Sequence, residues 1–547
     1  MNISKELSSL VSGDIHTDNE TLQTHSIDTS IFKVTPEVVV YPKDTEDVKK
    51  IVRFVSEHKR EFPNLSITGR GAGTDMTGGP LNESIILGFT KYFNHFSVDS
   101  EKLIGEVEPG VYYRDFEKET DASDIVLPSF PASKSLCALG GMIMNNSGGE
   151  MTLRYGQTRD HVSEISMVLA DGEGHTFAPL SNDELKGKME MNNFEGEIYR
   201  KVFHLLDSNY DVVKQAKPKT AKNSAGYALW RVWDREKGVF DLTQLFVGSQ
   251  GTLGVLTKAK VTLVKKKNHK RLVALFFKNW KHLPNVVNHI LPHKPESLET
   301  FDDATLKLGL RFMPEIAQKV GVPFLKFAFN FWPEALIGIR MLRLPKLIIL
   351  VQLAEDTEEE LDRKEKEILK DIEHLPVISR VLRSEKEAEK YWVMRRESFA
   401  LLRKHVSGKR TAPFIDDFCV LPDKMPEFLP KLLKILKEHH IVANIAGHAG
   451  SGNFHIIPLM DLSKQSEKDK ILLVADKVNT LIKEYEGTIT AEHNDGIMRT
   501  PYLEQMYGTA VYAIFKQIKE ILDPQNIFNP GKKIGGTKEY IAKHISH

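Results

Sequence analysis

The stretch Ser66-Ile67-Thr68-Gly69-Arg70-Gly71-Ala72-Gly73-Thr74-Asp75-Met76-Thr77-Gly78-Gly79 decides the fold, because an apolar strand runs directly into a glycine-rich turn. So many glycines let a backbone approach a ligand and aim several N–H groups at an anion such as pyrophosphate. The stretch matches neither the spacing of a Rossmann fingerprint nor the Gly-Lys-Ser/Thr of a P-loop. Taken alone, it is equally compatible with an ordinary tight loop.

Two more glycine-rich elements follow along the chain. One runs from 138 to 149 and the other from 247 to 255. Three loops that converge on one extended, phosphate-bearing cofactor is the functional interpretation, and three unrelated turns is the alternative. Composition alone favours neither.

Length and composition narrow the class of protein. The 547 residues include 74 basic and 74 acidic side chains and are 41% hydrophobic, which predicts a multi-domain globular protein. Zero net charge gives no general attraction to nucleic acid. The two cysteines, Cys137 and Cys419, exclude a disulfide framework, a cysteine-ligated iron–sulfur cluster and a Cys₄ zinc site. We therefore expect a reducing compartment, the cytoplasm, with no signal peptide and no spanning helix.

Strand and helix patterns alternate in the first half, as in α/β structure. Residues 38–41 and 245–247 read as strands, and Asp44 can cap a helix with an apolar stripe. The charged segment 357–372 and the segment 511–522 read as amphipathic helices.

A histidine pair in the second half suggests metal chemistry. Strand 441–446, a glycine-rich turn and strand 454–458 form a hairpin that can bring His448 and His455 to one rim. With the later carboxylate of Glu492 they have the composition of an open His₂Glu catalytic metal site. The alternative is two polar histidines that only satisfy hydrogen bonds.

The order of these motifs carries a family resemblance. Thr35-Pro36, the Arg70–Thr74 loop, Pro109-Gly110-Val111, Gly140-Gly141, Leu169–Gly172 and Gly248–Thr257 resemble the FAD domain of the vanillyl-alcohol oxidase/para-cresol methylhydroxylase (PCMH) superfamily. Gly447–His455, Glu492-His493 and Asn529–Lys532 resemble its D-lactate/D-2-hydroxyglutarate/glycolate dehydrogenase branch. The resemblance covers roughly residues 30 to 535.

The resemblance implies an α+β fold of mixed α/β character. A two-lobed PCMH-type FAD-binding domain is joined to a ferredoxin-like α+β cap. The expected divisions are an N-terminal extension (1–30), the FAD-binding domain (31–267), the substrate or cap domain (268–500) and a segment that returns to the FAD domain (501–547).

It also implies FAD held by backbone contacts of the glycine loops. Some superfamily members attach FAD through a histidine or cysteine of the first loop, but none stands here, so we expect non-covalent FAD. The implied cofactor-binding residues are Arg70, Gly71, Ala72, Gly73, Thr74, Asp75, Gly78, Gly79, Pro131, Ala138, Gly140, Gly141, Asn145, Gly148, Gly149, Gly254, Val255 and Asn529.

The implied activity is oxidation of a D-2-hydroxy acid, such as D-lactate or D-2-hydroxyglutarate, to the 2-oxo acid. Hydride passes to flavin N5, His493 takes the hydroxyl proton, and electrons leave to a quinone or a protein carrier. The family's Trp-x-x-Arg-Glu helix places Arg396 on the substrate carboxylate, with Arg395 as the alternative. One divalent metal, zinc or manganese, is expected on His448, His455 and Glu492.

This sequence departs from the family pattern on the substrate side. Ser451 and Gln250 stand where aspartate and glutamate are usual, and Asn494 replaces a glycine after His493. No lysine accompanies Asp416-Asp417. Two rival functions remain: an alkyl-ether-lipid synthase of the same superfamily, and a flavin electron-transfer subunit.

The segment 320–353 is the part least determined by the family pattern. Aromatic and aliphatic residues lie there beside Lys326, Arg340, Arg343 and Lys346. Such a mixture suits peripheral contact with an anionic membrane, at the inner face, where a quinone is available. An ordinary cap-domain core with cationic edges is the alternative.

Overall fold

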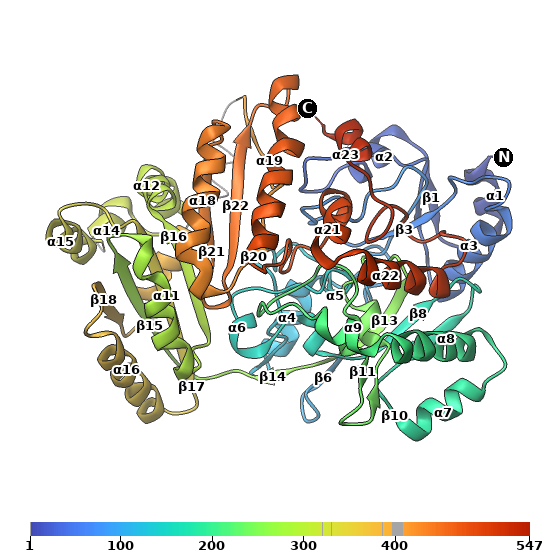
Figure 1. Cartoon of the computed structure of the whole chain (residues 1–547), viewed down its shortest axis with the longest axis horizontal. Helices are drawn as coiled ribbons and strands as arrows, with labels where there is room; N and C mark the ends of the chain where they lie inside the picture. Colours follow the sequence, from blue (N-terminus) through green and yellow to red (C-terminus); the bar gives the residue numbers. More distant parts are fainter. Residues whose placement is uncertain (1, 320, 330, 385–386, 396–407, 547) are drawn as a thin grey trace.

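The computed structural model describes residues 2–319, 321–329, 331–384, 387–395 and 408–546. In Figure 1 the first half of the chain, from blue to green, lies mainly on the right, and the cap lies on the left. Helix and strand are mixed throughout, in agreement with the predicted fold class.

The first lobe is a four-stranded sheet covered by helix α3 (Thr45–His58). The sheet order is β1 (Asp14–His16), β2 (Val38–Tyr41), β4 (Ile85–Gly88) and β3 (Ile67–Arg70). Asp44 caps α3 as predicted, its side chain accepting from the Asp47 N–H. Because β3 runs parallel to β4 and ends at Arg70, the glycine-rich loop leaves the carboxyl edge of the sheet, where α/β proteins bind ligands.

The second lobe is an antiparallel sheet. Its order is β5 (Phe96–Asp99), β6 (Ile104–Val107), β13 (Val255–Thr262), β8 (Val162–Val168) and β9 (Gly174–Phe177). The strand expected at 245–247 is wrong: residues Thr243–Phe246 form the helical turn α10. The Asp241 carboxylate accepts from the Thr243 N–H at 2.9 Å, and this local bond favours a turn over extended backbone.

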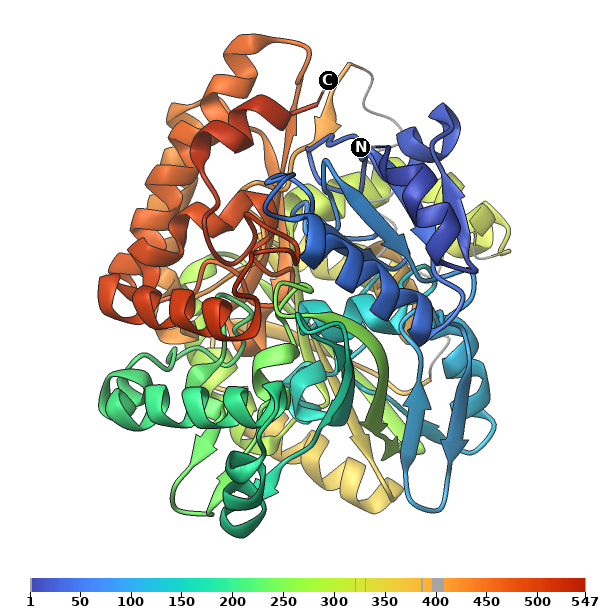
Figure 2. The same cartoon turned by 90° about the vertical axis from the view of Figure 1, so that its right-hand side faces the viewer.

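The cap is built on a sheet that begins at residue 269. Its main path is β18 (Val377–Leu382), β15 (His269–Phe277), β17 (Leu347–Glu355), β16 (Ser297–Asp302), β21 (Ala443–His448), β22 (Asn453–Met460) and β19 (Arg410–Thr411). One face packs on α11 (Leu283–Ile290), α16 (Glu358–Ile372), α18 (Met425–Glu438) and α19 (Gln465–Glu484). Figure 2 shows α19 standing beside the C-terminal helices.

The end of the chain returns to the first lobe. After α22 (Thr509–Leu522), Phe528 forms a β-bridge with Ile67, and the Asn529 N–H donates to the Ile67 carbonyl at 2.8 Å. This return fastens β3, and with it the first glycine loop, from behind.

The apolar segment 320–353 divides into two different environments. Its last part is strand β17, which lies between β15 and β16 with Leu347, Leu350 and Leu353 fully buried, so this part of the expected membrane-facing segment is sheet core. The preceding helices leave several large apolar side chains exposed. Among the described residues, no helix is both long and apolar enough to cross a bilayer.

A half-buried histidine in the second lobe makes stability pH-dependent. His175 on β9 bonds Asp171 at 2.9 Å and Glu195 at 3.2 Å. Burial opposes its charge, but the two carboxylates prevail and raise its pKa from 6.5 to about 9. The stabilisation is therefore complete below about pH 6.5 and lost as the pH rises through about 9. We expect thermal unfolding midpoints of the wild type and His175→Gln to differ most at pH 6 and converge above pH 9. A difference that grows with pH would contradict this pairing.

Candidate functional site

The three glycine loops line one cavity of about 700 Å³ between the two lobes and the cap. We call it the cofactor cavity. All but two of the predicted cofactor-binding residues lie on its wall. A Cβ placed on Gly141 would meet no atom of the chain within 4 Å, since it would project into this space. The first and second loops are in direct contact, because a Cβ on Gly71 would lie 3.2 Å from that of Ala138.

Side-chain amides tie the three loops together. Asn145 of the second loop donates to Asp75 of the first at 2.8 Å, and Gln250 of the third donates to Asn145 at 3.2 Å. Asn494, next to the histidine site, donates to the Gly248 carbonyl at 2.9 Å. The convergence that composition left open is therefore what the structure has, and an extended cofactor would meet a rigid wall.

Gly78 and Asn529, the other two expected cofactor-binding residues, do not line the cavity. Gly78 has a φ of +83° and backs onto Ile497, so it serves the turn itself. Asn529 donates to the carbonyls of Gly79 at 2.9 Å and Gln250 at 2.7 Å, which fastens two loops from behind.

The hairpin of β21 and β22 brings the predicted metal ligands together. The Nε2 atoms of His448 and His455 lie 3.1 and 3.3 Å from the same oxygen, Oε1 of Glu492. Their rings are 5.4 Å apart, and all three side chains line the cofactor cavity. Gly148 of the second loop touches Glu492, so the site adjoins the loops directly.

Each histidine is held from its other nitrogen by a buried carboxylate. Nδ1 of His448 lies 2.7 Å from Glu299, and Nδ1 of His455 lies 3.2 Å from Asp416. A carboxylate on one imidazole nitrogen fixes the ring and turns the other nitrogen toward a metal, as in many metal sites. Burial opposes the charge of His455, but Asp416 and Glu492 raise its pKa.

The predicted base, His493, stacks on His455 with ring centroids 4.9 Å apart. Its Nδ1 lies 2.8 Å from Asp416 Oδ2, which leaves Nε2 as the nitrogen available to a ligand in the cavity. Burial would lower the pKa of His493, but Asp417 and Asp416 outweigh it and raise that pKa. The backbone is fixed as well, because Asp417 accepts the N–H groups of Glu492 and His493 at 2.9 and 2.7 Å.

Lys222 is a functional candidate that the sequence reasoning missed. Its side chain is 1% exposed, and its Nζ lies 2.7 Å from Oε2 of Glu492. Burial opposes ionisation of Glu492, but Lys222 and His448 hold its pKa well below the usual range. With Oε2 engaged by the ammonium, Oε1 remains for the histidine side of the site.

The predicted substrate arginine, Arg396, lies outside the described residues. Its neighbour Arg395, the alternative, lines the cavity and forms an ion pair with Glu299. In the part of the chain that the structure describes, the buried Nε of Arg395 has no hydrogen-bond partner. A carboxylate in the cavity would satisfy that group.

The charges of the cluster fit a divalent cation. Among the described residues, Glu299, Asp416, Asp417 and Glu492 are buried around it, and Lys222 and Arg395 are the permanent cations in contact. Burying uncompensated charge is costly. The negative charge of the four carboxylates, beyond that balanced by Lys222 and Arg395, is therefore neutralised by protonated histidines or by a bound metal ion. The donor set, two imidazoles and a carboxylate with carboxylate partners behind them, is one that zinc and manganese accept. Among the described residues, the ligand atoms of Asp417, His455, Glu492 and His493 lie within 4.8 Å of one another; this group contains His455 and Glu492 of the predicted set but not His448.

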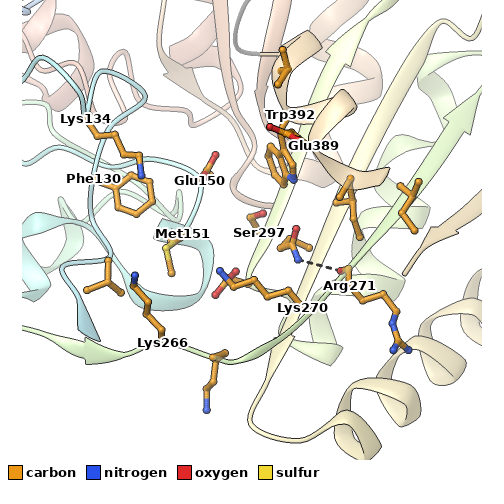
Figure 3. A pocket seen from close by; sticks show the side chains of 18 of the residues that line it. Phe130, Lys134, Glu150, Met151, Lys266, Lys270, Arg271, Ser297, Glu389 and Trp392 are labelled. Carbon is orange, nitrogen blue, oxygen red and sulfur yellow. Dashed lines mark hydrogen bonds between the residues drawn. The ribbon is translucent and has the colours of Figure 1, made fainter. Parts of the chain in front are cut away.

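A second cavity, also about 700 Å³, opens between residues 117–151 and the cap. Figure 3 shows Lys134 and Glu150 facing Trp392 and Lys270 across it. Its wall shares Phe130, Lys134 and Glu150 with the cofactor cavity, so the two are neighbours.

Two family models match most of the chain. Residues 36–178 match the FAD binding domain, and residues 266–533 match the C-terminal domain of FAD linked oxidases. These ranges contain the first two glycine loops and the whole histidine cluster.

Curated relatives are distant but extend over nearly the whole chain. D-2-hydroxyglutarate dehydrogenase of Escherichia coli is 26% identical over 95% of this chain, and the match covers 50% of that protein. The chain thus spans about half the length of the first curated relatives. Glycolate oxidase subunit GlcD of Bacillus subtilis is 27% identical over 92% of this chain and 89% of its own length.

Solved structures support the fold. p-Cresol methylhydroxylase superposes with a TM-score of 0.67 at 15% identity over 97% of this chain and 96% of its own. Alkyldihydroxyacetonephosphate synthase gives 0.65 at 14% identity, covering 96% and 84%. The glycine-lined cavity and the two matched domains lead to one conclusion: the chain belongs to the family in which an FAD binding domain is joined to the C-terminal domain of FAD linked oxidases, and it shares the fold of p-cresol methylhydroxylase.

Proposed function

We propose that this protein is an FAD-dependent dehydrogenase that oxidises a D-2-hydroxy acid to its 2-oxo acid. One observation carries the proposal: His448, His455, His493 and Arg395 line the same cavity as the glycine loops. The reaction needs a base for the substrate hydroxyl, a cation for the substrate carboxylate and a hydride acceptor beside them. The histidines, Arg395 and the FAD held by the glycine loops would meet these needs in one cavity. The similarity to D-2-hydroxyglutarate dehydrogenase of Escherichia coli and to glycolate oxidase subunit GlcD of Bacillus subtilis supports the substrate class.

The chain's own residues supply proton transfer and orientation. FAD, when bound non-covalently by the loops, supplies the hydride acceptor at N5, and a divalent metal on His448, His455 and Glu492 supplies Lewis acidity. Nε2 of His493 takes the hydroxyl proton, while Asp416 holds the ring from behind. Lys222 keeps Glu492 ionised and oriented.

Arg395 and Arg396 are the two proposed carboxylate partners. Arg395→Met leaves Glu299 without its guanidinium and removes a bidentate donor from the cavity, so we expect KM for the acid to rise at least tenfold. Arg396→Met, made alongside, identifies the arginine that binds substrate. If neither variant changes KM, the carboxylate is bound elsewhere.

His493→Ala is expected to slow flavin reduction by roughly 10²–10⁴-fold, the usual share of general-base catalysis. FAD content should remain unchanged, because the ring contacts Asp416 and stacks on His455. Rapid-mixing kinetics measure the effect. Unchanged flavin reduction in this variant would show that another group is the base.

Reoxidation needs an acceptor for two electrons, which we propose to be a quinone or a protein carrier. The second cavity offers an approach, since it shares three wall residues with the cofactor cavity. The proposed function is tested by a dye-coupled assay on matched D- and L-2-hydroxy acids with identification of the oxo acid. Turnover of the D series supports it, and turnover of neither series, with formation of an ether lipid from acyl-dihydroxyacetone phosphate, would establish the synthase alternative.

A further inference from the structure

An exposed apolar surface lies on helices α14 (Phe324–Phe329) and α15 (Trp332–Met341) and the turn after them. Of the sixteen large hydrophobic side chains exposed in the described chain, eight lie between residues 324 and 344. We call them the apolar platform: Phe324, Leu325, Phe329, Trp332, Leu336, Ile339, Leu342 and Leu344. Leu342 is 91% exposed and Leu325 81%. In Figure 1 these helices form the left-hand end of the molecule, at the far side of the cap from the FAD lobes.

The platform is anchored to the cap. Phe327 is 3% exposed and packs in a small core with Phe312 and Ile316. Glu334 of α15 forms ion pairs with Arg380 and with Lys390, the latter at 2.9 Å. The helices therefore already have a buried side that holds them in place, and the exposed apolar side is an additional one.

An apolar face of this extent marks an interaction site. A helix with apolar residues all round is ordinarily buried, and here the outer side has no cover among the described residues. Single exposed leucines are common on protein surfaces. Here, half of the exposed large hydrophobic residues of the described chain lie within 21 positions, and such a cluster requires an explanation.

The exposed basic residues around the apolar platform indicate what kind of partner binds it. Lys326, Arg340 and Arg343 are exposed within the segment, and Arg311 is exposed just before it. The acidic residue between 321 and 346, Glu334, is turned inward to its two ion pairs. Exposed large apolar groups in one segment with exposed cations match the headgroup region of an anionic bilayer, where aromatic and aliphatic side chains enter and lysine and arginine meet phosphates.

We propose that the apolar platform docks this protein peripherally on an anionic lipid bilayer. A second copy of the chain would bring the same cations face to face, which the charge pattern disfavours. The proposal is independent of the dehydrogenase function.

Vesicle flotation tests it with three sets of substitutions in the full chain. One variant carries Leu325→Ser, Phe329→Ser and Leu342→Ser, and a second carries Lys326→Gln and Arg340→Gln. The matched control carries Leu433→Ser, Val442→Ser and Leu473→Ser, three cap residues that are also exposed but lie outside the platform. Melting temperature and circular dichroism verify that each variant folds.

The wild type and the control are expected to float with phosphatidylcholine–phosphatidylglycerol vesicles at low salt and less at high salt. The apolar variant should bind at least tenfold more weakly, and loss of two cations should cost about 30-fold. Brominated lipid should quench Trp332 fluorescence, and this quenching should disappear in Trp332→Phe. A wild type that stays unbound at low salt, or an apolar variant that floats like the control, overturns the proposal. A wild-type dimer that the apolar variant converts to monomers, without vesicle binding, would identify a second copy as the occupant.

Discussion

Replacing His448 or His455 with alanine is expected to remove one divalent metal per chain and to abolish turnover while FAD stays bound. Both Nε2 atoms face Oε1 of Glu492, so either change deletes one of three converging donors. Metal content by mass spectrometry, flavin content by absorbance and dye-coupled turnover are measured on the same preparations. His374→Ala, an exposed histidine of the cap, is the matched control and should behave as the wild type.

Changing a carboxylate that holds one of the histidines from its Nδ1 side should weaken metal binding without abolishing it. Glu299→Gln keeps a hydrogen-bonding group on His448 Nδ1 but removes the charge, and we expect about 10–100-fold weaker metal binding. An active wild-type preparation that contains no metal and ignores chelators would contradict the metal site. His448 and His455 would then bond substrate directly.

Gly141→Leu is expected to abolish FAD binding, and with it all activity, while the chain still folds. The new side chain meets no atom of the protein within 4 Å at its Cβ and would occupy space that the cofactor needs. Gly187→Leu is the matched control, because this helical glycine is equally unobstructed but lies outside the cavity. Flavin content and the melting temperature of the apoprotein are the measurements.

Gly73 gives a less specific test of the same wall. Its φ is +71°, and a Cβ there would collide with the Arg70 guanidinium, so a substitution disturbs the loop itself. Wild-type flavin content in Gly141→Leu would show that the cofactor does not pass helix α5 (Leu139–Asn145), which carries Gly141.

Features encoded by local pattern could be predicted from the sequence. The glycine loops, the Asp44 cap and the hairpin that joins His448 to His455 each depend on neighbouring residues, and the structure has all three. The α10 turn was missed because the hydrogen bond that Thr243 N–H donates to Asp241 outweighed an apolar triplet.

Features that depend on distant pairs could not be predicted. Lys222 meets Glu492 across 270 positions, and Glu299 meets His448 across 149. The first contact arises only when the cap meets the FAD-binding lobes, and the second only when β16 pairs with β21 within the cap sheet, so no spacing rule finds them. The segment 320–353 illustrates the same limit, because its apolar residues became the interior strand β17 and helix α15, which leaves Trp332, Leu336 and Ile339 exposed.

In the proposed function, one cavity joins the flavin to the hydroxy-acid site. Anaerobic rapid mixing of the FAD-loaded protein with D- and L-2-hydroxy acids and their deoxy analogues tests it most directly. We predict that at least one D-2-hydroxy acid bleaches the visible flavin absorbance within seconds, that its deoxy analogue does not, and that His493→Ala slows the bleaching. A flavin that stays oxidised with every acid, although dithionite reduces it, would contradict the account and identify the protein as a carrier or a synthase.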